Sequence, residues 1–440
     1  MQLDSVMYKL QRLKHSHTGR VNVIHIGDSH IQADGMTSVI REGMQQYFGN
    51  AGRGIVFPYQ LAGSNAPRDV RSSSNTSWKS NKITTTEKPL PVGISGYGLH
   101  SNSATATVSV GLKDMEGRQE RFNKMVFFLC TDRVCYSLSD SDLSVPVVFY
   151  STNEGKSVTV NTEEMITGFK LARVNAPDNA DYGFYGVSLE KRDTPGVVYH
   201  SIGVNGARYD QYLQSDLFWE QLKELNGDLF VISMGTNEAQ NQAINPVTFA
   251  AMEDSFLQKI YSIAPRAAVI ITTPAASYYK KKKPNKAVQT VAESQKRACA
   301  AAKVSCWDLL DITGGLPAAA AWKKYGLIGA DLVHYTQAGY QLQGQLFAQA
   351  LASCYSQYEK VHPYKPTTTM PAAPTRNTPK KTTTTTDIID KPLYTNPAKP
   401  TPVVVQQPTP VPAKTDTIRT VVPVKPAPRP NSHITVEYSD

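Results

Sequence analysis

One segment decides the fold of this chain: residues 21–30, with the sequence VNVIHIGDSH. Its first six residues form a short run rich in β-branched side chains, which is typical of a buried strand in a parallel sheet. The small residues that follow predict a sharp turn, which exposes the hydroxyl of Ser29 at the carboxyl end of that strand. Open α/β sheets bind their ligands at this edge. Because Gly-Asp-Ser alone is more often an ordinary turn, its meaning depends on the segments downstream.

Helices and strands alternate on both sides of a long interruption. A helix with apolar residues at helical spacing is predicted over residues 1–14, and another over residues 35–48. The alternation resumes at Gly196, where further strands are predicted over 197–202, 228–234, 268–273 and 305–309, and a closing helix over 336–355. This pattern predicts an α/β fold, a parallel sheet with helices on both faces.

The interruption, residues 69–194, consists of short alternating segments separated by turn residues. Several short strands with few helical patterns predict an inserted β-sandwich. We expect it to fold on its own, with its two ends close together near Ser29. The α/β domain is then discontinuous and comprises residues 1–68 and 195–358. The sandwich is either a passive spacer or an extension of the substrate groove.

The last segment, residues 359–440, is rich in Pro, Thr, Lys and Val. It has too few apolar residues to form a core, so a disordered tail is predicted, and deleting it from Lys360 should leave folding unchanged. The formal net charge is +9, and the range 361–440 contains ten lysine or arginine residues against five acidic ones. This tail-weighted charge favours an anionic surface rather than nucleic acid as a partner.

The composition also excludes several classes of protein. No apolar run reaches the ~18–20 residues of a membrane helix, so no transmembrane segment is expected. No leader peptide is recognisable near the N-terminus, so an exported protein would have lost it. The cysteines are odd in number and lack zinc-type spacing: Cys130, Cys135, Cys299, Cys306 and Cys354. Buried thiols are the simpler interpretation, and a Cys130–Cys135 or Cys299–Cys306 bridge stays open for an oxidising compartment.

Three further loops follow predicted strands and complete an acyl-transfer site. The hydroxyl of Ser29 needs a base, which the segment Asp331-Leu332-Val333-His334 supplies. His334 would take the proton of Ser29, and Asp331 would orient the imidazole. The amide of Ser29, the amide of Gly206 and the side-chain amide of Asn237 are the candidate donors for an oxyanion. Each of these segments alone is weak evidence for a catalytic site. Their occurrence in this order, each after a predicted strand, favours catalysis.

These blocks resemble the SGNH (GDSL-type) hydrolase family, which implies a flavodoxin-like sheet and esterase chemistry without a metal or other cofactor. The stretches GDSHIQ at 27–32 and GRGIVFP at 52–58 are similar to peptidoglycan O-acetylesterases of the Ape type. That resemblance implies that the inserted module is carbohydrate-binding-like. One departure is His30, where the broader family usually has Leu; it lines the acyl pocket or simply packs.

We therefore expect a monomeric serine esterase that removes O-acetyl groups from a cell-wall glycan, above all peptidoglycan, in the periplasm or outside the cell. One alternative is an O-acetyltransferase, or an esterase for another acetylated sugar such as sialic acid or xylan. A second alternative is a non-catalytic wall-binding protein.

Four other features have plain structural interpretations. His25 is expected to be a satisfied core histidine, and Lys280–Lys283 a solvated loop or a contact for an anionic glycan. Arg53 and Asn65 are possible substrate contacts outside the predicted site.

Overall fold

A computed structural model describes most of the 440-residue chain. The described residues are 3–366, with gaps at 88–89, 116, 130–133, 141–142, 144–145, 152–156, 175–181 and 243, together with 435–438. Apart from residue 366, they belong to one compact unit formed by Met1–Lys365 and Ser432–Asp440. The second unit, Pro366–Asn431, is otherwise outside the described residues.

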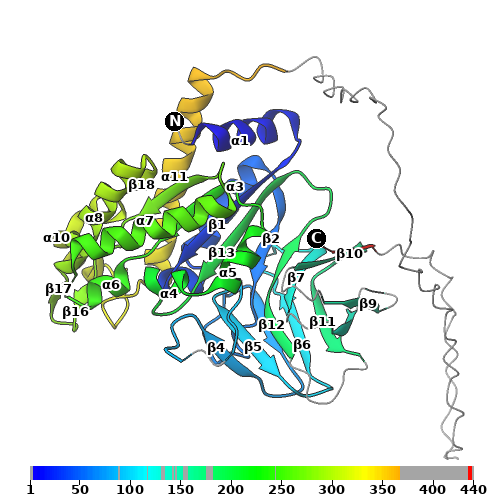
Figure 1. Cartoon of the computed structure of the whole chain (residues 1–440). Helices are drawn as coiled ribbons and strands as arrows, with labels where there is room; N and C mark the ends of the chain where they lie inside the picture. The colour runs from blue at the N-terminus through cyan, green and yellow to red at the C-terminus, as the bar shows by residue number, and fades with distance from the viewer. Residues whose placement is uncertain are drawn as a thin grey trace, which may run out of the picture. The chain divides into compact units, whose positions relative to one another are not determined.

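A twelve-stranded sheet runs through the described part of this unit (Figure 1). Six neighbouring strands are parallel and lie in the order β18 (Ser305–Trp307), β15 (Ala268–Thr272), β14 (Leu229–Ser233), β1 (Arg20–Gly27), β13 (Gly196–Gly203) and β2 (Asn50–Val56). Strand β1 is central, which agrees with its continuous apolar run. The predicted parallel α/β sheet is therefore confirmed.

Helices cover both faces of this sheet (Figure 1). On one face pack α1 (Asp4–Ser16), α3 (Thr37–Phe48) and α11 (Gln337–Val361). On the other pack α4 (Tyr209–Leu213), α5 (Asp216–Lys223), α7 (Pro246–Ile263) and α8 (Ala287–Ala302). The crossovers from β1 to β2 and from β13 to β14 run in opposite directions across the sheet. Right-handed crossovers then place their helices on opposite faces.

Short elements connect the larger ones. They are the helices α2 (Ser29–Gln32), α6 (Thr236–Gln240), α9 (Leu309–Ile312) and α10 (Gly315–Lys324), and the hairpin strands β16 (Tyr278–Tyr279) and β17 (Lys283–Pro284). Most of them follow the carboxyl end of a parallel strand, which is the edge where ligands of such sheets bind.

The inserted segment forms two facing sheets. One extends the central sheet through β12 (Tyr182–Glu190), β7 (Phe122–Leu129), β10 (Ser157–Ile166), β5 (Tyr97–Ser101) and β4 (Lys79–Lys82). The other, a five-stranded antiparallel sheet in the described residues, has the order β3 (Val70–Ser73), β6 (Thr107–Leu112), β11 (Gly168–Arg173), β8 (Cys135–Ser139) and β9 (Val147–Tyr150). Phe127 joins the two layers by packing against Phe149 and Phe169.

The sandwich therefore shares a sheet with the α/β domain, because β12 pairs antiparallel with β2. The boundaries expected at residues 68/69 and 194/195 stay predictions, but the backbone hydrogen bonds of the sheet cross them. All nine residues of β12 are buried, since the strand is covered on both faces. Sequence alternation revealed the two layers and gave no sign that one of them continues the parallel sheet.

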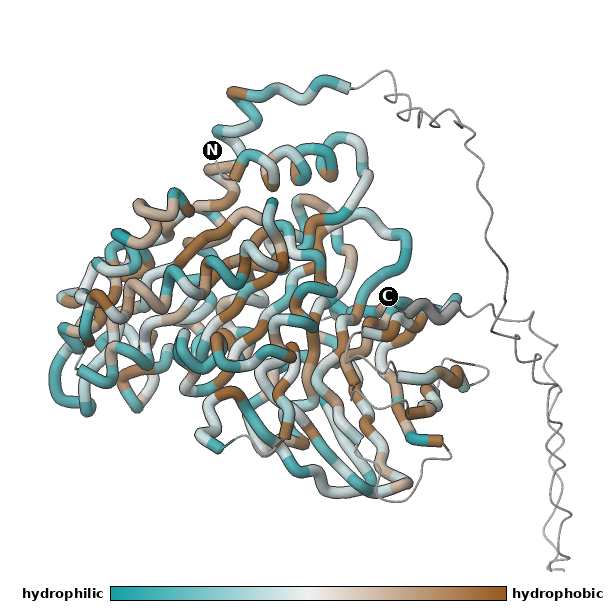
Figure 2. Tube along the Cα trace, viewed as in Figure 1, coloured by the Kyte–Doolittle hydropathy of each residue, from teal (hydrophilic) through white to brown (hydrophobic). Residues whose placement is uncertain are grey.

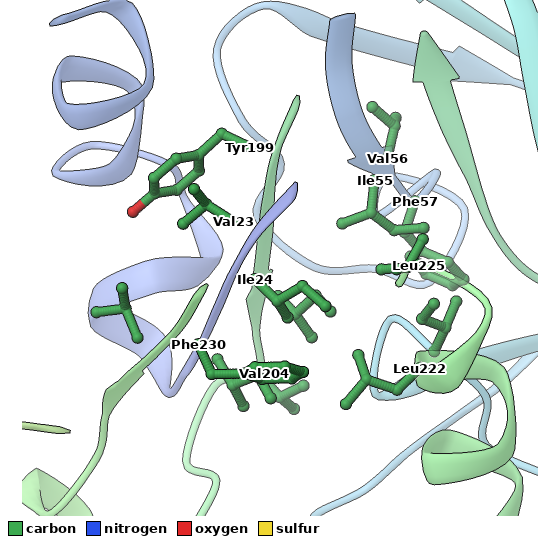
Figure 3. Close-up of a cluster of buried hydrophobic side chains, with 14 of the residues drawn as sticks. Val23, Ile24, Ile55, Val56, Phe57, Tyr199, Val204, Leu222, Leu225 and Phe230 are labelled. Atoms are coloured by element: carbon green, nitrogen blue, oxygen red, sulfur yellow. The ribbon is translucent and has the colours of Figure 1, made fainter. Parts of the chain in front are cut away.

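The core around β1 is apolar on both faces of the strand. Figure 3 shows Val23 beside Tyr199 on one side and Ile24 near Val204 and Phe230 on the other. Successive strand residues point to opposite faces, which explains this division. Burying each such side chain stabilises the fold by ~1.5–3 kcal/mol. Figure 2 shows the same pattern, with hydrophobic strands inside and hydrophilic turns outside.

A polar residue in this core is fully hydrogen-bonded. The ring nitrogens of His25 lie 2.7 Å from the Tyr199 hydroxyl and 2.6 Å from the Ser233 hydroxyl. Burial lowers the pKa of His25 to about 3, so the ring is neutral. The prediction of a satisfied core histidine is confirmed.

The C-terminal boundary lies later than predicted. Helix α11 continues to Val361, and the Nε2 atom of Gln11 donates to the carbonyl of His362 at 2.7 Å. The first residues of the predicted tail 359–440 are thus part of the fold, while 367–434 and 439–440 lie outside the described residues. Strand β19 (Thr435–Tyr438) pairs with β10.

The described residues bear on two further features of the sequence, its lack of a long apolar run and its cysteines. Among them, no helix is long and apolar enough to span a membrane. The described cysteines are all free thiols: Cys135, Cys299, Cys306 and Cys354. No Cys299–Cys306 bridge is therefore present, and the Cys130–Cys135 alternative involves Cys130, which is not among the described residues.

Candidate active site

Ser29 lies at the carboxyl end of β1, where the chain turns sharply into α2. A Cβ on Gly27 would approach the carbonyl oxygen of Ser233 to 2.8 Å and the Ile31 side chain even more closely, so this turn requires glycine. The carboxylate of Asp28 then caps α2 by accepting a hydrogen bond from the His30 amide at 2.9 Å. The turn places the Ser29 hydroxyl at the edge of the sheet, as the sequence predicted.

Ser29, His334 and Asp331 form a continuous hydrogen-bonded chain. The Nε2 atom of His334 lies 2.7 Å from the Oγ atom of Ser29, and its Nδ1 atom lies 2.6 Å from the Oδ2 atom of Asp331. The imidazole is thereby held between a hydroxyl and a carboxylate, which is the arrangement that activates a serine nucleophile.

The loop that carries the two partners is rigidly hydrogen-bonded. The Oδ1 atom of Asp331 accepts from the amides of Val333 and His334, each at 2.9 Å. Burial raises the pKa of Asp331, but these bonds and the bond from the imidazole outweigh it and lower the pKa to about 2. Asp331 is therefore ionised at neutral pH and able to orient the ring and stabilise its protonated form.

Asn237 reaches the same edge from the turn after β14. Gly235 has φ +113°, in the left-handed region, so the chain can turn there into α6. The Nδ2 atom of Asn237 donates to the Oδ2 atom of Asp28 at 3.2 Å and to the carbonyl of Ala207 at 2.9 Å. The second bond joins Asn237 to the residue that follows Gly206. The structure thus connects the Ser29, Gly206 and Asn237 blocks.

Asp28 is a buried member of the site that the sequence reasoning did not assign. It is 1% exposed and lies between the His30 amide and Asn237. Burial raises its pKa to about 7, although the bond from His30 and the charge of His334 act in the opposite direction. The sequence signal for Asp28 was its position between Gly27 and Ser29, directly after a buried strand. A carboxyl group buried there needs hydrogen-bond partners, which would make it part of the site.

Gln32 is a second unassigned residue, and it braces the site. Its Oε1 atom accepts from the amide of Asn205 at 2.7 Å and from the hydroxyl of Tyr97 at 3.0 Å. Its Nε2 atom donates to Ser64 and Asn65. Asn65, a possible substrate contact by sequence, is thus part of this brace. Gln32 connects α2 to the Gly206 loop and to the inserted segment.

His30 packs behind the catalytic imidazole. Its ring centroid lies 5.2 Å from that of His334, and its Nδ1 atom lies 2.9 Å from the Tyr340 hydroxyl. Burial lowers the pKa of His30 to about 3, so it carries no competing charge. The ring contacts of His30 show that it packs, and a part in lining the acyl pocket stays a prediction.

A cleft of about 180 Å³ lies between α3, the start of α11 and the inserted segment, and no residue of the triad lines it. Its lining includes Ala33, four residues after Ser29, and Gln337, three residues after His334. The inserted segment contributes its opposite wall, which contains Lys113, Met115, Arg118 and Glu120. The cleft is therefore built jointly by the α/β domain and the inserted segment.

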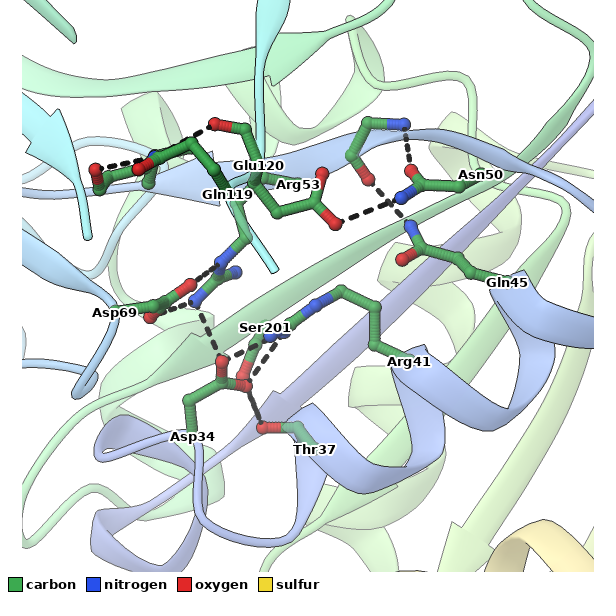
Figure 4. Close-up of polar contacts among 12 residues, drawn as sticks. Asp34, Thr37, Arg41, Gln45, Asn50, Arg53, Asp69, Gln119, Glu120 and Ser201 are labelled. Atoms are coloured by element: carbon green, nitrogen blue, oxygen red, sulfur yellow. Dashed lines mark hydrogen bonds and ion pairs between the residues drawn. The ribbon is translucent and has the colours of Figure 1, made fainter. Parts of the chain in front are cut away.

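Buried ion pairs support this cleft (Figure 4). The carboxylate of Asp34 binds Arg41 at 2.8 Å and Arg53 at 2.7 Å, and Arg53 also pairs with Asp69. Arg53 is only 3% exposed, so it holds the walls together and does not face substrate. These bonds join α3 to β2 and to the start of the inserted segment.

The described residues contain no group of three or more histidine, cysteine or acidic side chains that could hold a metal ion. The hydrogen-bonded triad itself supplies a nucleophile and a base, so the chemistry described below is assigned to these side chains.

Comparison with known proteins gives one family match. Residues 163–342 match the model of the GDSL-like lipase/acylhydrolase family, a range that contains Gly206, Asn237, Asp331 and His334. Ser29 precedes that range because the inserted segment separates it from the other blocks. No curated protein matches the chain.

Solved structures are similar to this chain to different extents. A peptidoglycan O-acetylesterase has a TM-score of 0.67 at 20% identity, covering 80% of this chain and 96% of that one. A lipase/acylhydrolase from Enterococcus faecalis has a TM-score of 0.28 at 20% identity, covering 36% and 77%. An acetylxylan esterase from Geobacillus stearothermophilus has a TM-score of 0.28 at 16% identity, covering 35% and 72%. The first likeness extends over the inserted sheets as well as the α/β domain.

Proposed function

We propose that this chain, which belongs to the GDSL-like lipase/acylhydrolase (SGNH) family, is a serine esterase that removes O-acetyl groups from peptidoglycan. The observation that carries the proposal is the chain of hydrogen bonds from Ser29 through His334 to Asp331. An acetyl ester is small and uncharged, so it suits a nucleophile at the open edge of a sheet.

Acylation starts when the Oγ atom of Ser29 attacks the acetyl carbonyl carbon. The Nε2 atom of His334 takes the hydroxyl proton, and Asp331 stabilises the imidazolium. The oxyanion is held by the amides of Ser29 and Gly206 and by the Nδ2 atom of Asn237, and each well-placed donor is worth ~2.7–4 kcal/mol. When the intermediate collapses, the bond to the sugar oxygen breaks and His334 protonates that oxygen.

Deacylation repeats these steps with water as the nucleophile. His334 removes a proton from water, the hydroxide attacks the acetyl carbonyl carbon, and the Ser29 oxygen leaves with the proton of the imidazolium. Acetate and free enzyme result. If a sugar hydroxyl replaced water in this step, the same residues would catalyse acetyl transfer.

The choice of a glycan substrate has two supports. The cleft between α3, the start of α11 and the inserted segment offers polar groups suited to sugar hydroxyls, including Ser38, Gln337 and Gln341. The solved structure with a TM-score of 0.67 is that of a peptidoglycan O-acetylesterase. A polymer of the cell wall would also place the protein in the cell envelope, and this location is part of the proposal.

The experiment is acetate release from three O-acetylated substrates: peptidoglycan, xylan and sialic acid. The wild type should release acetate fastest from peptidoglycan, and Ser29→Ala should release almost none. Faster release from xylan or sialic acid would overturn the substrate. Transfer of the acetyl group to an added sugar, with little free acetate, would identify a transferase. Binding to the wall without release would identify a non-catalytic protein.

A further inference from the structure

A patch of unpaired positive charge lies next to the catalytic loop. We define the lysine face as the hairpin residues Lys280–Lys283, the end of α10 with Lys323 and Lys324, and Tyr325. All of these residues are exposed, and Tyr325 is 73% exposed. Figure 2 shows the hairpin as hydrophilic, and Figure 1 places it, labelled β16 and β17, near α10 and α6. The face thus presents six cations and one aromatic ring to solvent.

Acidic side chains do not neutralise this face. Between residues 274 and 330 the chain has ten lysine or arginine residues and three acidic ones. In the described part of the chain, none of the six lysines forms an ion pair with a carboxylate. Three of them lie over aromatic rings instead: Lys280 over Tyr279 at 5.2 Å, Lys323 over Tyr278 at 5.7 Å and Lys324 over Tyr325 at 6.0 Å. The charges are therefore free to act on a partner.

The hairpin is fixed to the catalytic loop. The amide of Tyr278 donates to the carbonyl of Leu332 at 2.8 Å, between Asp331 and His334. The hydroxyl of Tyr335, directly after His334, donates to the carbonyl of Ala276 at 2.7 Å. A ligand held on the lysine face is therefore held next to the triad.

The oxyanion side of the site is fixed to the same hairpin. Asn285, which follows β17 and is fully buried, donates through Nδ2 to the carbonyl of Ala239 in α6 at 3.0 Å. Its amide donates to the carbonyl of Ser277 at 2.7 Å. Helix α6 also contains Asn237, so the hairpin is attached to both sides of the active site and presents its lysines at a defined place.

We infer that the lysine face binds carboxylate groups of an acidic glycan strand while an acetyl group of the same strand occupies the active site. Lysine ammonium groups attract anions and raise their local concentration. Tyr325 adds an exposed ring of the kind that packs against a sugar, since tyrosine presents an apolar face and a polar tip. Charge and ring together favour an acidic glycan. This inference rests on the proposed function, because it concerns the same polymer.

The test is co-sedimentation with insoluble O-acetylated peptidoglycan in two forms, one with free carboxylates and one with its carboxylates amidated. All proteins carry Ser29→Ala, so that the acetyl groups stay in place. The hairpin variant adds Lys281→Gln, Lys282→Gln and Lys283→Gln. The control variant adds Lys223→Gln, Lys303→Gln and Lys360→Gln, which remove the same charge. Lys223 is the last residue of α5, Lys303 directly follows α8, and Lys360 is in the last turn of α11. These helices run antiparallel to the strands, so their C-terminal ends lie at the amino edge of the sheet, opposite the active site.

We expect the hairpin variant to bind the free-carboxylate form about tenfold more weakly than the parent, as three exposed charge pairs would predict. The control variant should bind the free-carboxylate form like the parent. All of the proteins should bind the amidated form equally well. The difference should shrink as the salt concentration rises, because salt screens exposed charges. A second variant, Lys323→Gln with Lys324→Gln, should show a smaller loss of the same kind.

Three results would overturn the inference: equal binding by the parent and the hairpin variant, an equal loss in the control variant, or an equal loss on the amidated polymer. Failure of the proposed function would look different. Proteins with Ser29 intact would then release no acetate from either form of the polymer, whatever the binding assay shows. The two ideas are therefore tested by separate measurements.

Discussion

The Nδ2 atom of Asn237 donates to the buried Oδ2 atom of Asp28 at 3.2 Å, and its second hydrogen is used by the Ala207 carbonyl at 2.9 Å. Both hydrogens of this amide are thus engaged. To donate to an oxyanion, Asn237 must share or release one of them, and the longer bond to Asp28 is the weaker one. Asp28 is therefore a positioning residue that holds the amide near its working direction.

Replacing Asp28 by Asn should lower kcat by about tenfold to a hundredfold with a smaller change in KM. A neutral amide accepts more weakly than a carboxylate, so Asn237 loses part of its orientation. Asn237→Ala should cost ~10²–10³ in kcat, as loss of an oxyanion donor does. The double variant should be little worse than Asn237→Ala alone, because Asp28 acts through Asn237. Steady-state kinetics of the four proteins on p-nitrophenyl acetate measures this, and fully additive losses would refute it.

Ser29 should be the residue that becomes acylated. A serine-directed sulfonyl fluoride should label Ser29 alone and abolish turnover, because in the described part of the chain this is the hydroxyl that is paired with His334. Peptide mass spectrometry locates the label. The Ser29→Ala protein should remain unlabelled under the same conditions. Labelling of another serine, or near-normal turnover by Ser29→Ala, would show that the nucleophile lies elsewhere.

The two partners of Ser29 should differ in their effects. His334→Ala removes the base and should lower kcat by about 10³-fold or more, whereas Asp331→Asn keeps the ring in place but disturbs its tautomer. The two bonds from the amides of Val333 and His334 to Asp331 also hold the loop, and an Asn side chain keeps an oxygen for them. Asp331→Asn should therefore keep the melting temperature of the wild type. A drop of many degrees would mean that its kinetic loss reflects loop disorder.

Buried acids should make the fold less stable as the pH rises. Burial raises the pKa of Glu253 to about 8 and that of Glu238 to about 7, and each has one oxygen that finds no hydrogen-bond partner among the described residues. The folded state then holds protons that the unfolded chain, with pKa values near ~4.3, releases. Below pH ~6.5 the buried neutral histidines His25 and His30 have the opposite effect, because the unfolded chain protonates them. The free energy of unfolding should therefore fall from pH 6.5 to pH 8. Glu253→Gln should reduce this slope in chemical denaturation. A slope that is unchanged by the substitution would exclude Glu253 as its source.

The residues of the candidate site could be predicted from the sequence, but the hydrogen bonds that hold them in place could not. Ser29 and Asn237 follow the apolar strands β1 and β14, and parallel strands bring their carboxyl ends to one edge. The Asp331–His334 loop was expected after a strand as well, but it lies between α10 and α11. That rule needs only the order of strands along the chain. The brace around Gln32 depends instead on which loops meet in space: Tyr97 is 65 residues away and Asn205 173 residues away. No local pattern reports such contacts.

The inserted segment shows that prediction from local sequence patterns has the same limit for the fold. Alternation of side chains identified two layers of strands, because each strand has a buried face. It could not identify the partner of an edge strand. Strand β2 ends in Gly-Ile-Val and is buried throughout most of its length, which fits a strand with neighbours on both sides. The pairing of β2 with β12 is set by tertiary contacts between residues more than a hundred positions apart.

This pairing changes what removal of residues 69–194 should do. The sequence predicted a segment that folds on its own, and in that case a short Gly/Ser linker could replace it and leave the hydrolysis of p-nitrophenyl acetate intact. In the structure, the ring of Phe57 packs against Tyr97 at 5.3 Å and Phe184 at 6.5 Å, and both belong to the segment. Replacement would expose Phe57 and its neighbours Ile55 and Val56, each worth ~1.5–3 kcal/mol when buried.

We therefore expect the linker variant to lose activity on p-nitrophenyl acetate and on polymer alike, with a lower melting temperature or no cooperative transition. The loss on the small ester follows because Tyr97, a donor to Gln32, leaves with the segment. A chain ending at Pro366 is the matched control, since it keeps all of α11 and should melt and hydrolyse the ester like the wild type. If the linker variant instead kept its turnover of p-nitrophenyl acetate, the α/β domain would be independent of the inserted sheets, and only a role in holding the polymer would remain for them.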